Sequence, residues 1–289
     1  MSVRRIRARI KSRLPWSLLR AYRLAVATVR HPGDISSVVR FLVQPHSRLS
    51  FAQRLSVIRR FYLISYAVAS PHTQEEMLGV FEAVLSLPPD VRGCVVEAGS
   101  FKGGSTAKLS IAAKLAGREL VVFDSFEGMP EHSESYQQDA WGAEFHEGFS
   151  LAKGTYCGTL DEVRGNVQRF GHLEVCRFVK GWFDQTMPHF HEPVAVGYLD
   201  VDLASSTRSC LKYLYPLLAA GGVLFSQDGH FPMVREALDD DAFWAAEVGY
   251  PKPRMDGLGE RRLVVIPKPT TTSRAASSLP LQAEQAAAR

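Results

Sequence analysis

Four short apolar segments of this 289-residue chain each end at an acidic side chain, and this pattern limits the folds open to the chain. The segments alternate with stretches of helical periodicity, which favours a parallel sheet with helices on both faces. Parallel strands of an open α/β sheet end at one edge, and ligands bind outside that edge. One acid at a strand end can cap a helix, whereas four at the same edge indicate a ligand site. The four acids are Glu97, Asp124, Asp200 and Asp228.

Apolar runs and their breaks at Pro and Gly give the expected elements. Strands are expected at residues 94–98, 120–123, 174–179, 194–199, 223–225 and 262–266. Helices are expected at residues 51–69, 73–87, 105–116, 160–170, 205–219 and 232–247. The second of these helices begins with a capping box, in which Thr73 and Glu76 satisfy each other's backbone N–H groups.

The net charge of +4 conceals two oppositely charged parts. Residues 1–60 contain 14 Lys and Arg residues and a single acid, Asp34, whereas residues 61–289 contain 20 cations and 29 acids. Within the first part, residues 1–31 have apolar side chains at helical spacing, which predicts a basic amphipathic helix ended by Pro32 and Gly33. The expected organisation is a basic helical arm (1–60), an acidic α/β body (61–268) and a disordered tail rich in Ala, Ser, Thr and Gln (269–289).

Several classes of protein are disfavoured. The chain has no run of about 18 apolar residues, which argues against a membrane-spanning helix. Its four cysteines form no CxxC pair, which indicates reduced thiols in a cytoplasmic protein rather than a zinc site or a disulfide framework. Nucleic-acid binding is disfavoured because no stacking platform or groove-reading motif accompanies the basic charge. The cysteines are Cys94, Cys157, Cys176 and Cys210.

The loop after the first strand reads Glu97-Ala-Gly-Ser-Phe-Lys-Gly-Gly-Ser105. Its glycines permit a tight turn, and the helix that follows offers free N–H groups. The acid before the first glycine suits a ligand with positive charge, such as an ammonium or a sulfonium, better than a pyrophosphate. Asp124, at the end of the next strand, is placed to accept hydrogen bonds from a ribose. That acid does not distinguish NAD from S-adenosylmethionine.

Six motifs in order make the chain resemble the macrocin and novobiocin-type sugar O-methyltransferases, which depend on S-adenosylmethionine. The resemblance covers roughly residues 60–268. Its motifs are Val96–Ser105, Phe123–Pro130, Gly158–Val163 with Asn166, Lys180–Phe183 with Thr186 and Pro188, Leu199–Leu203 with Ser206 and Thr207, and Leu214–Pro216 with Gly221 and Gly222.

The resemblance implies a class I methyltransferase, Rossmann-like fold with a mostly parallel, seven-stranded sheet. It places Asp124 at the ribose of the cofactor, with Ser125 and Phe126 beside it, and Trp182 near the adenine. It also implies a homo-oligomer. The residues implied to bind the rest of the cofactor are Glu97, Gly99, Ser100, Gly103, Gly104 and Ser105.

The resemblance also implies a magnesium site, with Asp200 as general base. Asp200 and Asp228 match the acids of the family, whereas Gln227 stands where the family has another Asp, and Ala204 replaces a usual Tyr. Gln227 offers a carbonyl oxygen without charge, so the expected metal affinity is lower, and the sequence leaves open whether the metal is retained.

Other polar residues have simpler interpretations. We expect Asp202 to cap the helix that begins near Ser205. Asp239, Asp240 and Asp241 fit a solvated helix face, and His189 and His191 fit the surface. His230 is a candidate for the substrate pocket. The aromatic-rich stretch 128–157 is predicted to be a lid that excludes water from the substrate.

Three functions remain open from the sequence. The first is an O-methyltransferase that acts on a hydroxyl of a sugar, a glycoside or a similar small polar acceptor. The second is a nucleotide-dependent oxidoreductase, against which the glycine spacing and Glu97 argue. The third is a non-catalytic relative tethered by its basic arm. The arm fits an anionic membrane surface, which is the favoured interpretation, and also an acidic subunit or partner. The sequence does not identify the acceptor or which of its hydroxyls reacts.

Overall fold

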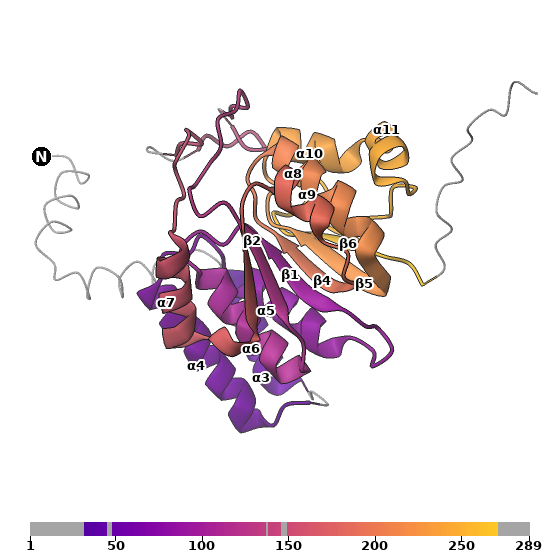
Figure 1. Ribbon diagram of the computed structural model, residues 1–289. Coiled ribbons are helices and arrows are strands. Elements are labelled where there is room, and N and C mark those ends of the chain that lie inside the picture. Colours follow the sequence, from indigo (N-terminus) through magenta and orange to yellow (C-terminus); the bar gives the residue numbers. More distant parts are fainter. Residues whose placement is uncertain (1–31, 45–47, 137, 146–148, 271–289) are drawn as a thin grey trace, which may run out of the picture.

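A six-stranded sheet forms the centre of the molecule (Figure 1). The computed structural model describes residues 32–44, 48–136, 138–145 and 149–270. The strand order is β3-β2-β1-β4-β5-β6, with all pairs parallel except β5 and β6. The strands are β1 (Cys94–Ala98), β2 (Leu120–Asp124), β3 (Cys176–Lys180), β4 (Val194–Leu199), β5 (Leu218–Ser226) and β6 (Val264–Pro267).

The mostly parallel sheet is as predicted, but the number of strands is not. The described part of the chain has six strands, and the expected seventh came from the family resemblance rather than from an apolar segment of this chain. Helix α9 also ends earlier than predicted. The residues from Leu218 onward extend β5 because Leu218 pairs with Val194 of β4. Pairing with the neighbouring strand therefore overrides the local helical pattern.

Helices cover both faces of the sheet. One group is α3 (Pro32–Val43), α4 (Phe51–Ala67), α5 (Gln74–Ser86), α6 (Gly104–Ala116), α7 (Leu160–Phe170) and η1 (Leu173–Val175). The other is α8 (Phe183–Thr186), η2 (Met187–His189), α9 (Ala204–Leu217), α10 (Pro232–Asp239), α11 (Asp241–Phe243) and η3 (Trp244–Val248). In Figure 1 the first group lies mostly in the lower half and the second at the upper right. Because side chains alternate along a strand, Val95 joins the core under the first group and Val96 the core under the second.

Capping residues define the starts of the helices before the sheet. Ser50 and Gln53 form a capping box for α4, and Thr73 and Glu76 form the predicted one for α5. Pro32, where the sequence predicts the end of the preceding helix, is the first residue of α3, a position that proline favours. The expected amphipathic helix at 1–31 and the tail beyond residue 270 lie outside the described residues. None of the described helices is long and apolar enough to span a membrane.

Candidate active site

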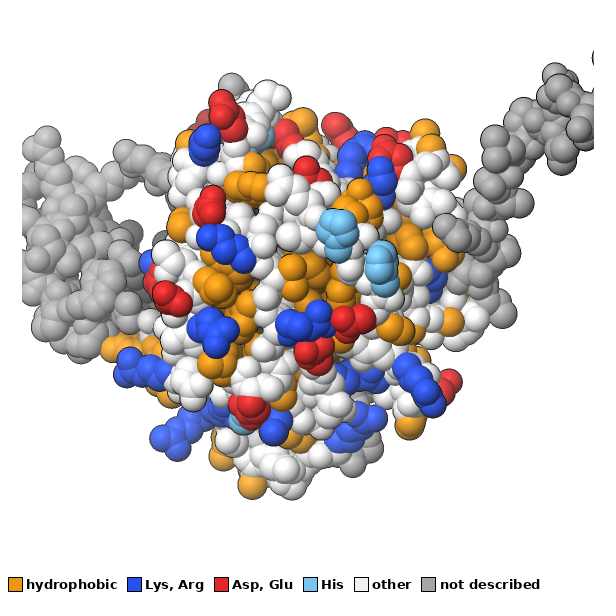
Figure 2. All heavy atoms as spheres, in the orientation of Figure 1, with side chains coloured by type: hydrophobic (Ala, Val, Ile, Leu, Met, Phe, Trp, Pro, Cys, Tyr) orange, Lys and Arg blue, Asp and Glu red, His pale blue; other side chains and the backbone are white. Residues whose placement is uncertain are grey.

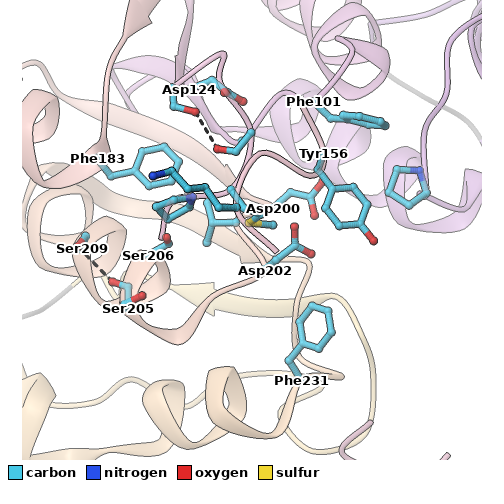
Figure 3. Close-up of a pocket in the computed structure, with 18 of the residues that line it drawn as sticks. Phe101, Asp124, Tyr156, Phe183, Asp200, Asp202, Ser205, Ser206, Ser209 and Phe231 are labelled. Carbon is cyan, nitrogen blue, oxygen red and sulfur yellow. Dashed lines mark hydrogen bonds between the residues drawn. The ribbon is translucent and has the colours of Figure 1, made fainter. Parts of the chain in front are cut away.

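A cavity of about 800 Å³ opens at the carboxyl edge of the sheet (Figure 3). Asp124 and Asp200 line it, whereas Glu97 and Asp228 lie behind its wall and are fully buried. The structure therefore brings the four predicted acids to one edge, with two of them open to a ligand. Within the described ranges, four residues other than glycine have positive φ, a strained conformation that clusters at functional sites. They are Phe101, Phe126, Tyr156 and Asp202, and all but Phe126 line this cavity.

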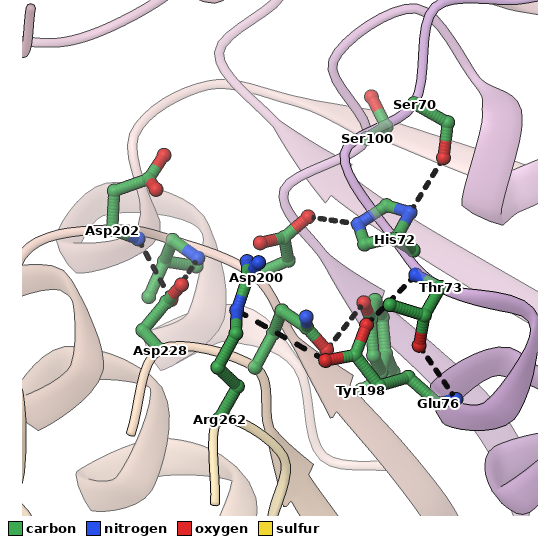
Figure 4. Close-up of polar contacts among 12 residues, drawn as sticks. Ser70, His72, Thr73, Glu76, Ser100, Tyr198, Asp200, Asp202, Asp228 and Arg262 are labelled. Carbon is green, nitrogen blue, oxygen red and sulfur yellow. Dashed lines mark hydrogen bonds and ion pairs between the residues drawn. The ribbon is translucent and has the colours of Figure 1, made fainter. Parts of the chain in front are cut away.

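Asp200 is held in place by a histidine that the sequence gave no reason to single out. Oδ2 of Asp200 lies 2.6 Å from Nε2 of His72, and Nδ1 of that ring lies 2.7 Å from Oγ of Ser70 (Figure 4). His72 comes from the connection between α4 and α5. The Asp200 side chain retains partial access to the cavity, while the His72 side chain is buried.

Asp202 does not cap helix α9, contrary to our expectation. Its carboxylate joins those of Asp200 and Asp228, and one oxygen from each lies within 4.8 Å of the others. The positive φ of Asp202, +59°, turns the chain after β4, so the alternation of side chains along the strand no longer applies to it. The backbone N–H groups of Val201 and Asp202 both donate to Oδ2 of Asp228, at 2.9 and 2.8 Å.

The three clustered carboxylates interact unfavourably. Burial and the charge of Asp200 raise the pKa of Asp228 to about 7. Partial burial and the carboxylates of Asp228 and Asp200 raise the pKa of Asp202 as well. The positive charge of Arg262 favours the ionised carboxylates and so partly lowers the pKa of both Asp202 and Asp228. Such a group of oxygen donors suits a divalent cation, which would relieve the repulsion.

Gln227 is buried behind the cavity rather than exposed to it. Its side chain is fully buried, and its Oε1 accepts a hydrogen bond of 3.3 Å from the Tyr198 hydroxyl. It is not among the residues that line the cavity. The role of Gln227 as a metal ligand stays a prediction, and Asp202 is the third carboxylate beside Asp200 and Asp228.

Asp124 is fixed by the loops on either side of it. Its Oδ2 accepts from the backbone N–H and the hydroxyl of Ser100, at 2.6 and 2.9 Å, and its Oδ1 accepts from the N–H of Phe126 at 2.6 Å. Asp124 and Ser125 line the cavity, and Trp182 lines it from the start of α8. Ser100 and Phe126 do not line it but orient Asp124, and their contact with a cofactor stays a prediction.

The glycines of the loop after β1 make room for other parts of the chain. A Cβ on Gly99 would lie 1.9 Å from the backbone oxygen of Asp200, and a Cβ on Gly104 would lie 2.9 Å from the Cβ of Ser70. Gly99 and Gly103 also have positive φ. Gly99 is the one residue of the predicted loop set that lines the cavity, so contact of the others with a cofactor stays a prediction. The others are Glu97, Ser100, Gly103, Gly104 and Ser105.

Glu97 is an unusual residue for the middle of a sheet. It is fully buried in β1, and neither of its carboxylate oxygens has a hydrogen-bond partner among the described residues. Burial raises the pKa of Glu97 to about 8, although Ser105 and Thr106 oppose the shift. The carboxyl is therefore largely protonated near neutral pH unless a cation lies beside it.

The predicted lid stretch covers one side of the cavity. Its carboxylate Glu134 accepts hydrogen bonds from the N–H groups of Ala204 and Ser205 and from the Ser205 hydroxyl, at 2.6 to 3.0 Å. Glu134 thus takes the capping role that we expected of Asp202. Partial burial raises the pKa of Glu134, but these hydrogen bonds outweigh it and lower the pKa overall. The lid residues that line the cavity are Gly128, Met129, Pro130, Glu131, Asp139, Trp141, Glu144, Phe145, Phe149, Lys153 and Tyr156.

Aromatic contacts join the same stretch to the start of α10. The Tyr136 ring stacks on that of Phe231 with centroids 4.7 Å apart, and Phe145 stacks on Phe149 at 4.2 Å. Phe231 is buried at the centre of this group. These contacts give the cavity an apolar wall close to the acidic cluster, because the N–H of Phe231 donates to the backbone oxygen of Asp228 at 2.9 Å.

The remaining predicted residues divide between the cavity and the surface. His230 lines the cavity, and burial lowers its pKa to about 4, so the ring is neutral near pH 7. His189 and His191 are exposed and do not line it. The three adjacent acids lie on the surface as expected: Asp239 and Asp241 pair with Lys252, and Asp240 caps α11.

Comparison with known proteins places the chain among methyltransferases. The family model described as macrocin O-methyltransferase (TylF) matches residues 75–251. The chain belongs to the TylF family. The described structure aligns with that of the O-methyltransferase NovP over 70% of this chain and 84% of the other, with 25% identity and a TM-score of 0.56. This alignment supports the class I methyltransferase fold.

Two curated relatives of this TylF-family chain are named for methylation of specific hydroxyls. The tetracenomycin-C 4'-O-methyltransferase of Streptomyces olivaceus, whose name specifies a rhamnosyl group, is 34% identical over 60% of this chain. The mycinamicin III 3''-O-methyltransferase of Micromonospora griseorubida is 31% identical over 54% of it. The aligned residues span 66% and 62% of these two relatives, less than two thirds of each.

Proposed function

We propose that this chain transfers a methyl group from S-adenosylmethionine to a hydroxyl of a sugar or glycoside, with Asp200 as general base. The observation that carries the proposal is the position of Asp200, whose carboxylate opens into the cavity while His72 fixes one of its oxygens. The name of one relative, which specifies a rhamnosyl group, supports this class of acceptor. Membership of the TylF family disfavours the oxidoreductase that the sequence left open.

The donor half of the cavity fits S-adenosylmethionine. Asp124 presents a fixed carboxylate for the ribose hydroxyls, and Trp182 offers an aromatic face for the adenine. Gly99 lets the loop approach closely, and the buried Glu97 adds an acid behind it. When bound, the cofactor supplies an electrophilic methyl group on a positively charged sulfur.

The acceptor half supplies a base and excludes water. The acceptor hydroxyl gives its proton to the free oxygen of Asp200 as its own oxygen bonds to the methyl carbon. The bound cofactor would take up the electron pair of the broken carbon–sulfur bond on its sulfur, so the charges would balance with Asp200 protonated. Alignment of the two substrates supplies much of the rate of such an in-line displacement. The wall around Phe231 and Phe145 keeps water from competing for the methyl group.

We also propose that Asp200, Asp202 and Asp228 hold a magnesium ion. The grouping of three carboxylate oxygens within 4.8 Å and the raised pKa of Asp228 support this. Magnesium binds oxygen ligands and keeps several waters, so three carboxylates suffice. When bound, the metal would lower the pKa of the acceptor hydroxyl and orient it.

A third proposal concerns the basic arm, which we assign to an anionic lipid surface. On α3, Ile35, Val39 and Val43 are 53%, 53% and 72% exposed and recur every four residues, so they form one apolar stripe. On α4, Phe51, Leu55 and Leu63 are also exposed.

The charges around these stripes suit an anionic surface. Arg40, Arg48 and Arg59 are exposed, whereas Asp34, the single acid of residues 1–60, is buried. Several blue side chains lie over the lower part of the molecule, the region of α4 in Figure 1 (Figure 2). Apolar side chains beside cations suit the headgroup region of an anionic bilayer.

Two measurements test the enzymatic proposal. Calorimetric titration should show binding of S-adenosylhomocysteine and none of NAD. Transfer of labelled methyl from S-adenosylmethionine to 4-nitrophenyl α-L-rhamnopyranoside should be detectable, and Asp200→Asn should abolish it while cofactor binding remains. Failure to bind S-adenosylhomocysteine would overturn the proposal, and full activity of Asp200→Asn would remove Asp200 as the base.

A further inference from the structure

The connection between α4 and α5 contributes side chains to the site from outside the region that the family model matches. That region begins at residue 75, whereas Ser70 and His72 precede it. His72 is buried, and its ring contacts Asp200, which lies 128 residues further along the chain. In Figure 4 the ring of His72 lies between Ser70 and Asp200.

The imidazole of His72 is fixed at both nitrogens and on one face. Nδ1 lies 2.7 Å from the Ser70 hydroxyl, and Nε2 lies 2.6 Å from Oδ2 of Asp200. The ring meets that of Tyr198 edge to face, with centroids 5.8 Å apart. A neutral ring satisfies both contacts when Nε2–H donates to the carboxylate and Nδ1 accepts from the serine hydroxyl.

The position of the Ser70 side chain in turn depends on the absence of a side chain at Gly104 in the glycine loop. The Cβ of Ser70 would lie 2.9 Å from a Cβ on Gly104, so only glycine at 104 permits the observed contact. Contacts therefore run from the start of α6, through Ser70 and His72, to the carboxylate at the cavity. This accounts for Gly104, which does not line the cavity itself.

We propose that His72 is a positioning residue that holds Oδ2 of Asp200 and thereby turns the other oxygen toward the acceptor hydroxyl. A carboxylate on a short side chain rotates freely unless its environment restricts it. A partner that orients a reacting group in this way typically changes activity about 10- to 100-fold when removed. The inference rests on the proposed function of Asp200 as the base.

Kinetics of three variants test the inference with the rhamnoside as acceptor. His72→Ala should lower kcat about 10- to 100-fold with little change in the KM of the acceptor or in the affinity for S-adenosylhomocysteine. His72→Gln should restore most of kcat, because the amide Nε2 can donate where the imidazole Nε2 does. His189→Ala, an exposed histidine outside the cavity, should behave as wild type. An unchanged kcat in His72→Ala would overturn the inference.

Crystal structures of the variants test, independently of activity, whether His72 orients the Asp200 carboxylate. In His72→Ala the Asp200 carboxylate should be rotated or occupy more than one conformer, and in His72→Gln it should keep its place. An unmoved Asp200 in His72→Ala would overturn the inference even if activity fell. Absence of methyl transfer by the wild type would instead count against the proposed function. If His72→Ala does not fold, Ser70→Ala replaces it. The His72 ring then loses the hydrogen bond at Nδ1, and kcat should still fall.

Discussion

Glu134 accepts hydrogen bonds from both the N–H and the hydroxyl of Ser205, although 71 residues separate them. This contact binds the lid stretch to the first turn of α9, next to Asp202. The N-terminus of a helix carries a partial positive charge, so a carboxylate is favoured there. The lid and the acidic cluster are therefore joined through one helix end.

Removal of this contact should weaken both the fold and acceptor binding. We expect Glu134→Gln to lower the free energy of unfolding by about 1–2 kcal/mol, because it loses charged hydrogen bonds at a helix N-terminus. The KM of the acceptor should rise more than kcat falls, since the lid is held less firmly. Thermal melting and steady-state kinetics measure these changes. Glu260→Gln is the control, because Glu260 is exposed and does not line the cavity. Equal effects of the two variants would contradict the prediction.

The metal proposal predicts which acid matters for magnesium binding. Magnesium should raise the melting temperature of the wild type, because a ligand that binds the folded state stabilises it. Asp202→Asn should abolish most of this increase, since it removes one of three clustered carboxylates. Asp239→Asn should leave it unchanged, because Asp239 pairs with Lys252 on the surface. If Gln227→Leu abolished the increase and Asp202→Asn did not, Gln227 would be the ligand.

The sequence predicts the four strand-end acids because strand period and strand ends are local properties. Asp124 and Asp200 follow apolar runs directly, and their exposure to the cavity follows from the topology of a parallel sheet. The same reasoning fails for Asp202. That reasoning assumes that side chains alternate beyond the end of β4, whereas a positive φ, uncommon for residues other than glycine, turns the chain there.

No local sequence pattern indicates the role of His72. It immediately precedes the capping box at Thr73, where the sequence indicates only the start of a helix. Its contact with Asp200 depends on how α4 and α5 pack against the sheet, and this is a long-range property. The glycine loop illustrates the same limit: its spacing shows that glycine is needed, but only the structure shows that Ser70 occupies the space beside Gly104.

The buried Glu97 should make stability depend on pH. Its folded pKa of about 8 lies above the ordinary value of 4.5, so the folded state binds its proton more tightly than the unfolded state. The contribution of protonated Glu97 to the free energy of unfolding is therefore complete below about pH 4.5 and is lost as the pH rises toward 8. The melting temperature of the wild type should fall between about pH 5 and pH 8, and Glu97→Gln should flatten this slope. Equal slopes for the two proteins would contradict the assignment.

The basic arm should bind vesicles that carry negative charge. We expect the full chain to float with vesicles of phosphatidylcholine and phosphatidylglycerol, and not with phosphatidylcholine alone, because each Lys or Arg near an anionic surface contributes about 1 kcal/mol. The triple variant Ile35→Ser, Val39→Ser, Val43→Ser should float less, since these side chains are exposed on α3. Removal of residues 1–31 should weaken flotation further. Leu115→Ser, at an exposed apolar position on α6, serves as the control. If the wild type were a dimer that the triple variant converts to a monomer, with no flotation of either, the face would be a contact between copies and the lipid proposal would be wrong.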